Sequence, residues 1–436
     1  MKRSITRQTD IGSNHLPMRT IDDRRSTEEL SSIVRRPSLA IQPHAIDVFS
    51  RVRTIASVRS CDCGLQGPEN LILALAEALR ERGVRYVIVN LWDGDPPTVA
   101  LHEEALRRGL ESYIVATESS FDPAILPRLA VQLQRINPDA IHTHDFKSEM
   151  TVLAANTILR RPLVGSFYGR LAINSLFLKI EDWTRLIAFR LFGRLLANSL
   201  AQRDELLRWR HPARKIDVLP SFVDTHRITP PTPDERLAAR DKLGIDRDRP
   251  VLATVARLSQ NKGHSFMIRA LAEVRTVVPD VLYLIPGEGD SSWHGEGGFR
   301  GELERLADQL GVAEHTRFLG YYPELGTILH ASDLLVSPSL REGMQVSLIE
   351  AMAAGLPIVA TAVGGTPDAV ADGESGLLVP PSDADALAGR VIELLGDRER
   401  MRRLGAAGRR RAEELFDSRV VAAQVLHACE EVASHA

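Results

Sequence analysis

The stretch LLVSPSLREGMQVSLIEAMAAGLPIVATAVGG, residues 334–365, decides the fold. It opens with a short apolar run, Leu334–Ser337, continues with a helical pattern, and returns to an apolar run at Pro357–Ala360. A strand, a helix and a second strand in this order predict a parallel unit, because the crossover helix returns the chain to the same end of the sheet. We expect the helix to begin at about Gly343–Met344 and to end at Gly355, a C-terminal glycine followed by proline.

The amino end of this helix predicts an anion site. Its first amides have no intrahelical partner and carry the positive end of the helix dipole, which favours phosphate. Glu342 lies just before this end, and Glu350 follows Gly343 by about two turns, so we expect it on the same face. The two carboxylates could accept hydrogen bonds from two polyol groups, or they could be a dipole charge and a surface charge. Because Glu350 lies within the apolar run Val346–Met352, we favour the ligand interpretation.

The same alternation of strands and helices extends in both directions from this unit. It runs over residues 53–224 and resumes at residue 251, after a stretch rich in proline and charge at 225–250. This pattern predicts two doubly wound α/β domains of the Rossmann-like type in series. A final helix is expected to return to the first domain, and the amino-terminal stretch, which shows no sustained period, is expected to be disordered. The predicted extension, first domain, second domain and terminal helix are residues 1–50, 51–224, 225–415 and 416–436.

Composition narrows the classes of function. The chain has 436 residues, of which 44% are hydrophobic and 25% charged, with a formal net charge of -3, so nucleic acid is not expected as the main partner. Its three cysteines, two of them in Cys61-Asp62-Cys63, do not make a disulfide framework, and a reducing cytosol is the simplest setting. No apolar run approaches the ~18–20 residues of a spanning helix, and we expect no signal segment.

Three further loops in the second domain carry glycine or charge where a strand ends. Arg257 and Lys262 are two cations five residues apart on a turn, an arrangement that could hold one diphosphate from two sides. The loop Gly287-Glu288-Gly289 permits close approach of a ligand, although a plain tight turn is equally open. Gly364-Gly365 opens another helix with free amides. Together these loops predict a pocket for a nucleotide-linked polyol with a diphosphate at its centre.

These motifs resemble the signature of the retaining GT-B glycosyltransferases of family four. The resemblance rests on Glu342-x7-Glu350 followed by Ala-Met-Ala-Ala-Gly-Leu-Pro and Val-Gly-Gly. It also rests on Ala256-Arg257-Leu258 with Lys262-Gly263, on Gly287-Glu288-Gly289, and on Phe318-Leu319-Gly320. The match is detailed over about residues 250–385 and looser over 53–224. It implies two Rossmann-like domains facing across a cleft, with the donor bound by the second and the acceptor by the first.

The resemblance implies a role for each matching residue in the second domain. Arg257 and Lys262 would neutralise the donor diphosphate and its leaving group. Glu342 would hold hydroxyls of the donor sugar, and Glu350 would bind the ribose. Amides of Gly343 and Met344 would assist Glu342, and the other implied donor-binding residues are Gln345, Gly287, Leu319 and Gly320, the last two lining the base.

The nucleotide-diphosphate sugar is expected as a co-substrate rather than a cofactor. The family is generally metal-independent, so we expect neither a metal nor another cofactor. The Asp-x-Asp spacing Asp246-Arg247-Asp248 lies in the stretch between the domains.

On the acceptor side the resemblance is looser. Gly67 belongs to a loop in the position of the family's Gly-rich acceptor loop, although Leu65 and Gln66 split the usual Gly-Gly pair. His144 resembles the family's histidine at a strand end. With His142 and Asp145 it could also form a metal site, but we expect the two histidines to point to opposite faces of the strand.

Two departures from the family pattern also fall in this domain. Tyr168, which precedes Gly169, stands where many relatives have a histidine near the donor sugar, and its phenol could hydrogen-bond a sugar or pack against it. Ser221-Phe222 stands where Asn-Gly is common. Acceptor chemistry in this chain is therefore expected to depart from that of most relatives.

The apolar stretch Leu171–Leu196 contains Lys179, Arg185, Arg190 and Arg194. This pattern fits a buried crossover helix joined to a strand. It also fits an interfacial helix that touches anionic lipid. We therefore expect a cytoplasmic protein with at most peripheral membrane contact.

The leading functional hypothesis is transfer of a hexose from a nucleotide diphosphate to a glycan or lipid-linked acceptor, for surface polysaccharide. The alternatives are a sugar-nucleotide epimerase of the same fold, and a non-catalytic subunit that binds the sugar nucleotide. Tyr168 is the residue that would support the latter.

Overall fold

The computed structural model describes residues 52–60, 65, 67–93, 99–117, 122–169, 176–289 and 298–434. The expected disordered extension and Cys61-Asp62-Cys63 lie outside these residues. Of the described helices, none is long and apolar enough to cross a membrane.

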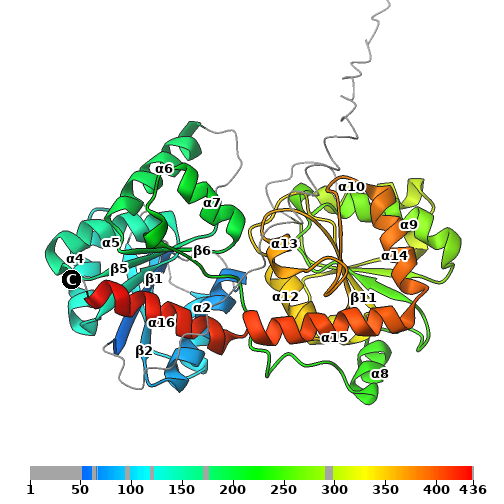
Figure 1. Cartoon of the computed structure of the whole chain (residues 1–436), viewed down its shortest axis with the longest axis horizontal. Coiled ribbons are helices and arrows are strands. Elements are labelled where there is room, and N and C mark those ends of the chain that lie inside the picture. The colour runs from blue at the N-terminus through cyan, green and yellow to red at the C-terminus, as the bar shows by residue number, and fades with distance from the viewer. Residues whose placement is uncertain are drawn as a thin grey trace, which may run out of the picture. The chain divides into compact units, whose positions relative to one another are not determined.

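The first domain is built on a parallel sheet of seven described strands in the order β3-β2-β1-β4-β5-β6-β7. Its strands are near-continuous apolar runs because helices cover both faces of the sheet (Figure 1). The strands are β1 Thr54–Ser60, β2 Arg85–Asp93, β3 Ser112–Thr117, β4 Ala140–Thr143, β5 Leu163–Phe167, β6 Arg194–Ala197 and β7 Ile216–Val218. The helices are α2 Gly67–Glu81, α3 Ala100–Arg107, α4 Ile125–Ile136, α5 Phe146–Leu159, α6 Leu176–Ala188 and α7 Leu200–Arg208, with short 3-10 turns η1 Phe189–Leu191 and η2 Ala213–Lys215.

The second domain repeats this plan with a parallel sheet of six described strands in the order β10-β9-β8-β11-β12-β13. The strands are β8 Val251–Ala253, β9 Leu282–Pro286, β10 Thr316–Gly320, β11 Leu334–Ser337, β12 Ile358–Thr361 and β13 Leu377–Val379. The helices are α8 Pro233–Lys242, α9 His264–Val277, α10 Gly298–Gln309, α11 Leu325–Ala331, α12 Val346–Ala353, α13 Thr366–Ala369, α14 Ala384–Leu395 and α15 Arg398–Leu415, with η3 Gln260–Lys262 and η4 Ala313–His315. The predicted pair of doubly wound α/β domains is confirmed.

Strand order fixes where ligands can bind in each domain. In the first sheet the order reverses between β1 and β4, and in the second it reverses between β8 and β11. In sheets of this kind a crevice opens beyond the carboxyl ends of the two strands at the reversal. The loops after β8 and β11 are those that carry Arg257, Lys262 and Glu342.

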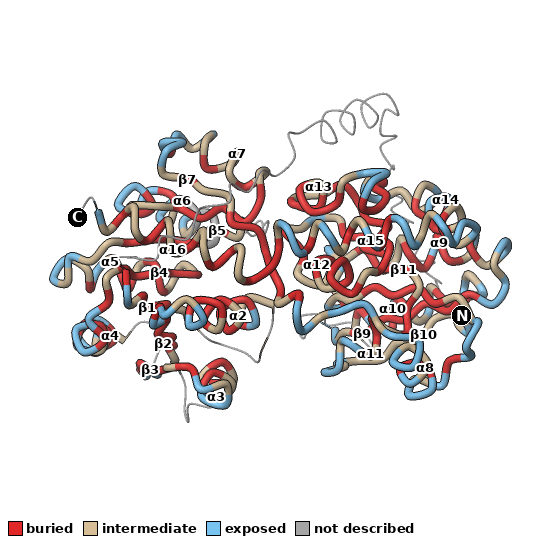
Figure 2. Tube along the Cα trace, turned by 60° about the horizontal axis from the view of Figure 1, so that its bottom comes forward, coloured by how far each residue is buried: buried red, intermediate tan, exposed pale blue. Residues whose placement is uncertain are grey.

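The last helix, α16 (Ser418–Ser434), packs in the core of the first domain. Val421, Val425 and Cys429 are fully buried in the same hydrophobic cluster as Ile55 of β1 and Leu79 of α2. Buried residues, red in Figure 2, alternate along this helix with partly exposed ones, in tan. Just before α16 the chain pairs with the segment that leaves the first sheet, because the Val223 amide donates to Phe416 O and the Ser418 amide donates to Val223 O.

The stretch between the domains is more ordered than its composition suggests. Within residues 225–250 lies α8, which starts at a capping box between Thr232 and Glu235. Arg236 and Arg240 of this helix both pair with Asp333, which precedes β11. The expectation that the secondary-structure pattern lapses here was therefore wrong, and the prolines mark the start of a helix docked on the second domain.

Candidate active site

The centre of the predicted site is an ion pair between two loops of the second domain. Lys262 Nζ lies 2.6 Å from Glu342 Oε1, and Ser339 Oγ donates to the same oxygen at 2.7 Å. The Glu342 side chain is 9% exposed and that of Lys262 is 20% exposed. The structure thus brings together two residues that are 80 positions apart in the chain and places them where β8 and β11 end.

Close backbone contact holds these loops together. A Cβ on Gly263 would lie 1.9 Å from Pro338 O, and a Cβ on Gly364 would lie 1.8 Å from Glu342 O. Both glycines have positive φ, +67° and +55°. These positions therefore require glycine, which places Lys262 and Glu342 at fixed positions.

The backbone at residues 343–345 differs from the prediction. The helix begins at Val346, with Gln345 in an extended conformation before it. The predicted start at Gly343–Met344 was wrong because these carbonyls have partners elsewhere. Gly343 O accepts from the Gly365 amide at 2.5 Å, and Met344 O accepts from Ser221 Oγ at 2.9 Å.

The amides of this extended segment are available to a ligand. Those of Gly343, Met344 and Gln345 donate to no acceptor in the described part of the chain. The Gln345 side chain is engaged in the protein, since its Oε1 accepts from Ser337 Oγ at 2.6 Å. The predicted anion site is thus a short run of free amides before α12 rather than the first turn of a longer helix.

Glu350 lies in the middle of α12 and is partly exposed. Burial raises the pKa of its carboxyl group to about 7. Gly343 lies outside the helix, so its spacing from Glu350 does not place the two residues on one helix face. Glu350 is instead one turn after Val346, whose side chain reaches within 3.5 Å of the Cβ position of Gly67 in the first domain.

The Arg257 side chain is exposed, and it is the backbone of this residue that contacts a neighbouring side chain. The guanidinium has no hydrogen-bond or ion-pair partner among the described residues, whereas Arg257 O lies 3.2 Å from His264 Nε2. His264 is buried at the start of α9, and burial lowers the pKa of its imidazole to about 4, so it is neutral at pH 7. Sequence reasoning missed this histidine, although it directly follows the Lys262-Gly263 motif.

The loops after β8, β9 and β10 are joined by their backbones. The Gly287 amide donates to Gly320 O, and the Leu258 amide donates to Glu288 O, both at 2.7 Å. Leu319 and Gly320 at the end of β10 are partly exposed. The residues predicted to contact the diphosphate and the base therefore lie on adjacent loops.

On the first domain, a buried polar network lies at the end of β4. His144 contacts Ser57 Oγ through Nε2 at 3.0 Å and Tyr168 OH through Nδ1 at 3.3 Å. His142 contacts Tyr86 OH at 3.0 Å and Ser166 Oγ at 2.8 Å. Burial holds the pKa of both imidazoles below its usual range, to about 3 for His142, so both are neutral at pH 7.

The expectation that His142 and His144 point to opposite faces was wrong. Their rings are 4.1 Å apart, because residues i and i+2 of a strand share a face. Hydroxyl groups partner the imidazoles. The described residues include no group of three or more His, Cys, Asp or Glu side chains arranged to hold a metal.

Residues of the first domain also surround Gly343. Its Cβ position lies 3.0 Å from Gln202 Nε2, 3.2 Å from Asn198 Oδ1 and 3.3 Å from Tyr168 O. Gly169 follows Tyr168 with a φ of +93°, and its Cβ position is 2.8 Å from Gln202 Nε2. Asn198 Oδ1 is buried and has no partner in the described structure. Sequence reasoning missed Asn198 and Gln202, which lie in no motif.

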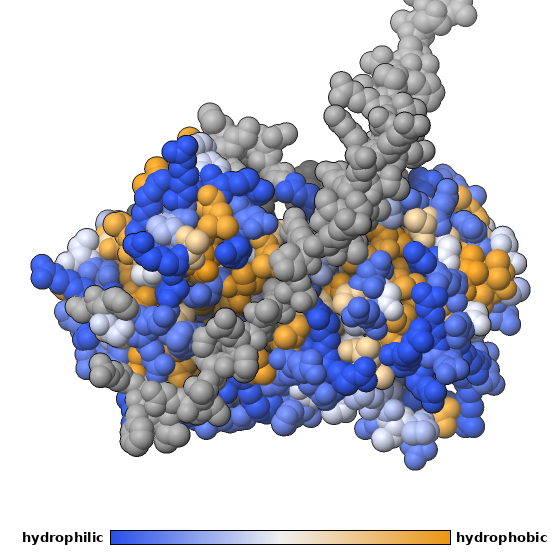
Figure 3. Space-filling model, in the orientation of Figure 1, coloured by the Kyte–Doolittle hydropathy of each residue, from blue (hydrophilic) through white to orange (hydrophobic). Residues whose placement is uncertain are grey.

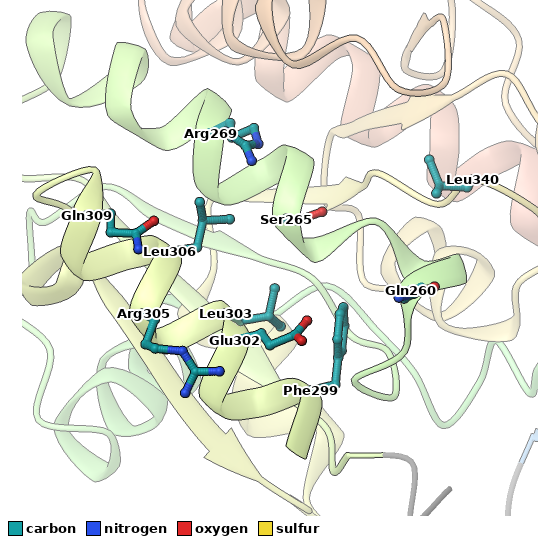
Figure 4. Close-up of a pocket in the computed structure, with 10 residues that line it drawn as sticks. All are labelled: Gln260, Ser265, Arg269, Phe299, Glu302, Leu303, Arg305, Leu306, Gln309 and Leu340. Atoms are coloured by element: carbon teal, nitrogen blue, oxygen red, sulfur yellow. The ribbon is translucent and has the colours of Figure 1, made fainter. Parts of the chain in front are cut away.

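A separate hollow of about 590 Å³ lies between α9 and α10 (Figure 4). Its lining mixes Arg269, Arg305 and Glu302 with the apolar Phe299 and Leu303. None of the predicted donor-binding side chains lines it.

Comparison with known proteins agrees with this fold. The family description Glycosyltransferase Family 4 matches residues 65–227, and Glycosyl transferases group 1 matches residues 235–411. The GDP-mannose-dependent alpha-(1-6)-phosphatidylinositol monomannoside mannosyltransferase of Mycolicibacterium smegmatis is 32% identical over 65% of this chain and 75% of its own. The D-inositol 3-phosphate glycosyltransferase of Nocardia farcinica is 31% identical over 84% of each chain. The crystal structure of Anabaena HepE in complex with UDP has a TM-score of 0.74 at 21% identity, covering 85% of this chain and 98% of that one.

The two Rossmann-like domains, taken with these matches, identify a glycosyltransferase of the GT-B class that uses a nucleotide sugar. More particularly, the chain belongs to glycosyltransferase family four.

Proposed function

We propose that this enzyme transfers a hexose, with retention of anomeric configuration and without a metal, from a nucleotide-diphosphate sugar to a glycan or lipid-linked acceptor. Its place would be the cytoplasm or the inner face of the membrane, in the synthesis of cell-surface polysaccharide or glycolipid. The observation that carries the proposal is the contact of Lys262 with Glu342 beside three free amides.

The Lys262–Glu342 contact supplies a positive charge for the leaving diphosphate and a carboxylate for the donor sugar. When the bond between the anomeric carbon and the phosphate oxygen breaks, its electron pair goes to the leaving diphosphate. Lys262, Arg257 and the amides of residues 343–345 would stabilise that charge. The acceptor hydroxyl oxygen bonds to the anomeric carbon from the same face, and its proton passes to the leaving phosphate oxygen.

Glu342 would orient the sugar in this reaction. Its carboxylate accepts from Lys262 and Ser339 through one oxygen, Oε1. The second oxygen remains to accept hydrogen bonds from donor-sugar hydroxyls. Glu350, farther along α12, would bind the ribose, and Leu319 and Gly320 would line the base.

The relatives indicate which substrates to test first. One is named for GDP-mannose and for a phosphatidylinositol monomannoside, and another for D-inositol 3-phosphate. We therefore place GDP-mannose first among donors, and test a phosphoinositide glycolipid against a soluble inositol phosphate as acceptors.

The test is a thermal-shift panel of sugar nucleotides, followed by transfer assays with the donor that stabilises most. Transfer that needs both substrates, tolerates EDTA and gives a product with the donor's anomeric configuration by proton NMR is expected. Conversion of the donor to an epimer without acceptor would identify an epimerase instead. Binding without turnover for every acceptor tried would favour a non-catalytic subunit, and loss of turnover in EDTA would overturn metal independence.

A further inference from the structure

One face of α6 exposes a line of large apolar side chains. Ile180, Trp183 and Ile187 are 57%, 55% and 58% exposed, and Leu191 at the end of η1 is 72% exposed. Spacings of three and four residues place Ile180, Trp183 and Ile187 on one side of α6, and Leu191 follows four residues later at the end of η1. Scattered exposed apolar residues are ordinary, but three on one helix face followed by a fourth on the next turn form a stripe.

The opposite face of α6 is fixed to the body of the domain. Arg185 forms a two-point ion pair with the buried carboxylate of Glu149, with distances of 2.6 and 2.7 Å. Its guanidinium also donates to Ser166 O, and it lies over the rings of Phe167 and Phe189. Because this face is anchored, the apolar stripe keeps its outward orientation.

Positive charge surrounds the stripe. The ring of Trp183 lies 4.5 Å from that of Trp209, which brings the end of α7 beside α6. Lys215 Nζ donates to Phe192 O, which brings η2 beside η1. Residues 187–215 contain seven Arg and Lys against two acidic residues, Asp204 and Glu205, and α6 itself adds Glu181 and Asp182. The cations that are exposed here are Arg190, Arg208, Arg210 and Arg214.

We propose that this α6 surface, made of the apolar stripe Ile180, Trp183, Ile187 and Leu191 and these four arginines, docks on an anionic lipid bilayer. Apolar side chains with indole among them, flanked by arginine, are the composition of a helix that lies in the headgroup region. In Figure 3 orange and blue residues are interleaved over this region, at the upper left of the view.

Charge favours a bilayer over a second copy of the chain. In a symmetric dimer through this face, the same arginines would meet across the interface and repel one another. An anionic leaflet would instead pair each of them with a phosphate. The surface lies outside the loops that carry the proposed reaction, and its test needs neither donor nor acceptor.

The experiment is co-sedimentation of the full chain with vesicles of pure phosphatidylcholine, and with vesicles of equal parts phosphatidylcholine and phosphatidylglycerol. We expect roughly tenfold stronger partition to the anionic vesicles, weakened by added salt. The double variant Trp183→Ser/Ile187→Ser should lose about tenfold in partition. The matched variant Leu106→Ser/Val277→Ser removes two equally exposed apolar side chains elsewhere and should partition like the wild type.

A second variant keeps the test decisive if loss of the Trp183–Trp209 contact unfolds the domain. Ile187→Ser/Leu191→Ser leaves both tryptophans in place and should also lose partition while melting within a few degrees of the wild type. Absence of wild-type partition, or equal partition of both stripe variants and the wild type, overturns the proposal. A dimer in sedimentation velocity that the stripe variants dissociate would assign the face to a second copy instead.

Discussion

Lys262 Nζ lies 2.6 Å from Glu342 Oε1, and the two side chains come from loops that end different strands of one sheet. Gly263 on the Lys262 loop and Gly364 on the loop after β12 both lie tightly against the backbone of the Glu342 loop, which fixes the position of both residues. The pair is thus built into the fold of the second domain, and its removal should affect turnover and stability differently.

Lys262→Ala should lower kcat by about 10²–10³-fold, because an electrostatic contact to the leaving group is lost. It should also lower the free energy of unfolding by about 1–3 kcal/mol, since the Glu342 carboxylate remains largely buried without its cation. Adding Glu342→Gln to this variant should recover much of the stability and none of the turnover. Transfer kinetics and urea unfolding measure the two effects.

A matched control is the ion pair of Lys242 with Glu324, in which both side chains are about half exposed. Solvent screens such a pair, so Lys242→Ala should change stability by less than about 1 kcal/mol and leave kcat unaltered. Equal turnover of Lys262→Ala and Lys242→Ala would contradict the role given to Lys262.

Gly364→Ala should damage the proposed donor site. The new Cβ would lie 1.8 Å from Glu342 O, so one of the two loops must move. Gly373→Ala is the control, since Gly373 also has positive φ (+75°) but has nothing within 4 Å of its Cβ position. Gly373→Ala should lower the free energy of unfolding by only the backbone strain, about 1 kcal/mol. Gly364→Ala should lower it several times more, and should also weaken donor binding measured by calorimetry. Similar melting temperatures for the two variants would count against a tight contact.

The meeting of the proposed donor loops at one edge of the sheet could be predicted from the sequence, because the pattern that marks each loop is local. Cations, glycines and carboxylates follow strands at short spacing, and parallel strands bring such loops to one edge. The start of α12 could not be predicted, because the carbonyls of Gly343 and Met344 take partners from Gly365 and Ser221, which are distant in the chain.

The proposed acceptor side depends on packing that no local motif encodes. Asn198 and Gln202 reach Gly343 only through the arrangement of the two domains. His142 and His144 are two residues apart, so strand alternation places them on one face, and their contact could have been predicted from the sequence.

Tyr168→Phe should act on transfer rather than on folding. The substitution removes the hydroxyl that lies 3.3 Å from His144 Nδ1 and keeps the ring. If this phenol orients the acceptor or the donor sugar, kcat/KM should fall about tenfold, as for the loss of one oriented hydrogen bond. Tyr113→Phe, which removes an exposed hydroxyl bonded to Glu111, is the control and should keep wild-type kinetics. An unchanged kcat/KM in Tyr168→Phe would show that the Tyr168 hydroxyl does not orient either substrate.

The raised pKa of Glu350 predicts that the stability of the fold decreases as pH rises. Burial raises the pKa of this carboxyl group to about 7 in the folded chain, above the 4.5 of a free glutamate. Between these two values the folded state binds more protons than the unfolded state, so its contribution to stability falls as pH rises. Above pH 7 the ionised Glu350 should lower the free energy of unfolding by its full amount. Because the side chain is partly exposed, we expect this amount to be about 1–2 kcal/mol.

Glu350→Gln should therefore be more stable than the wild type at pH 8 and similar to it at pH 5, as measured by urea unfolding. Glu399→Gln, at an exposed position of α15, should show no such crossover. Donor binding should show the opposite trend, because ribose hydroxyls donate to the ionised carboxylate. Wild-type affinity for the nucleotide should thus rise as pH increases through about 7, and Glu350→Gln should bind weakly at every pH. If the wild-type affinity for the nucleotide does not change between pH 6 and 8, Glu350 does not bind the ribose, whatever the stability curves show.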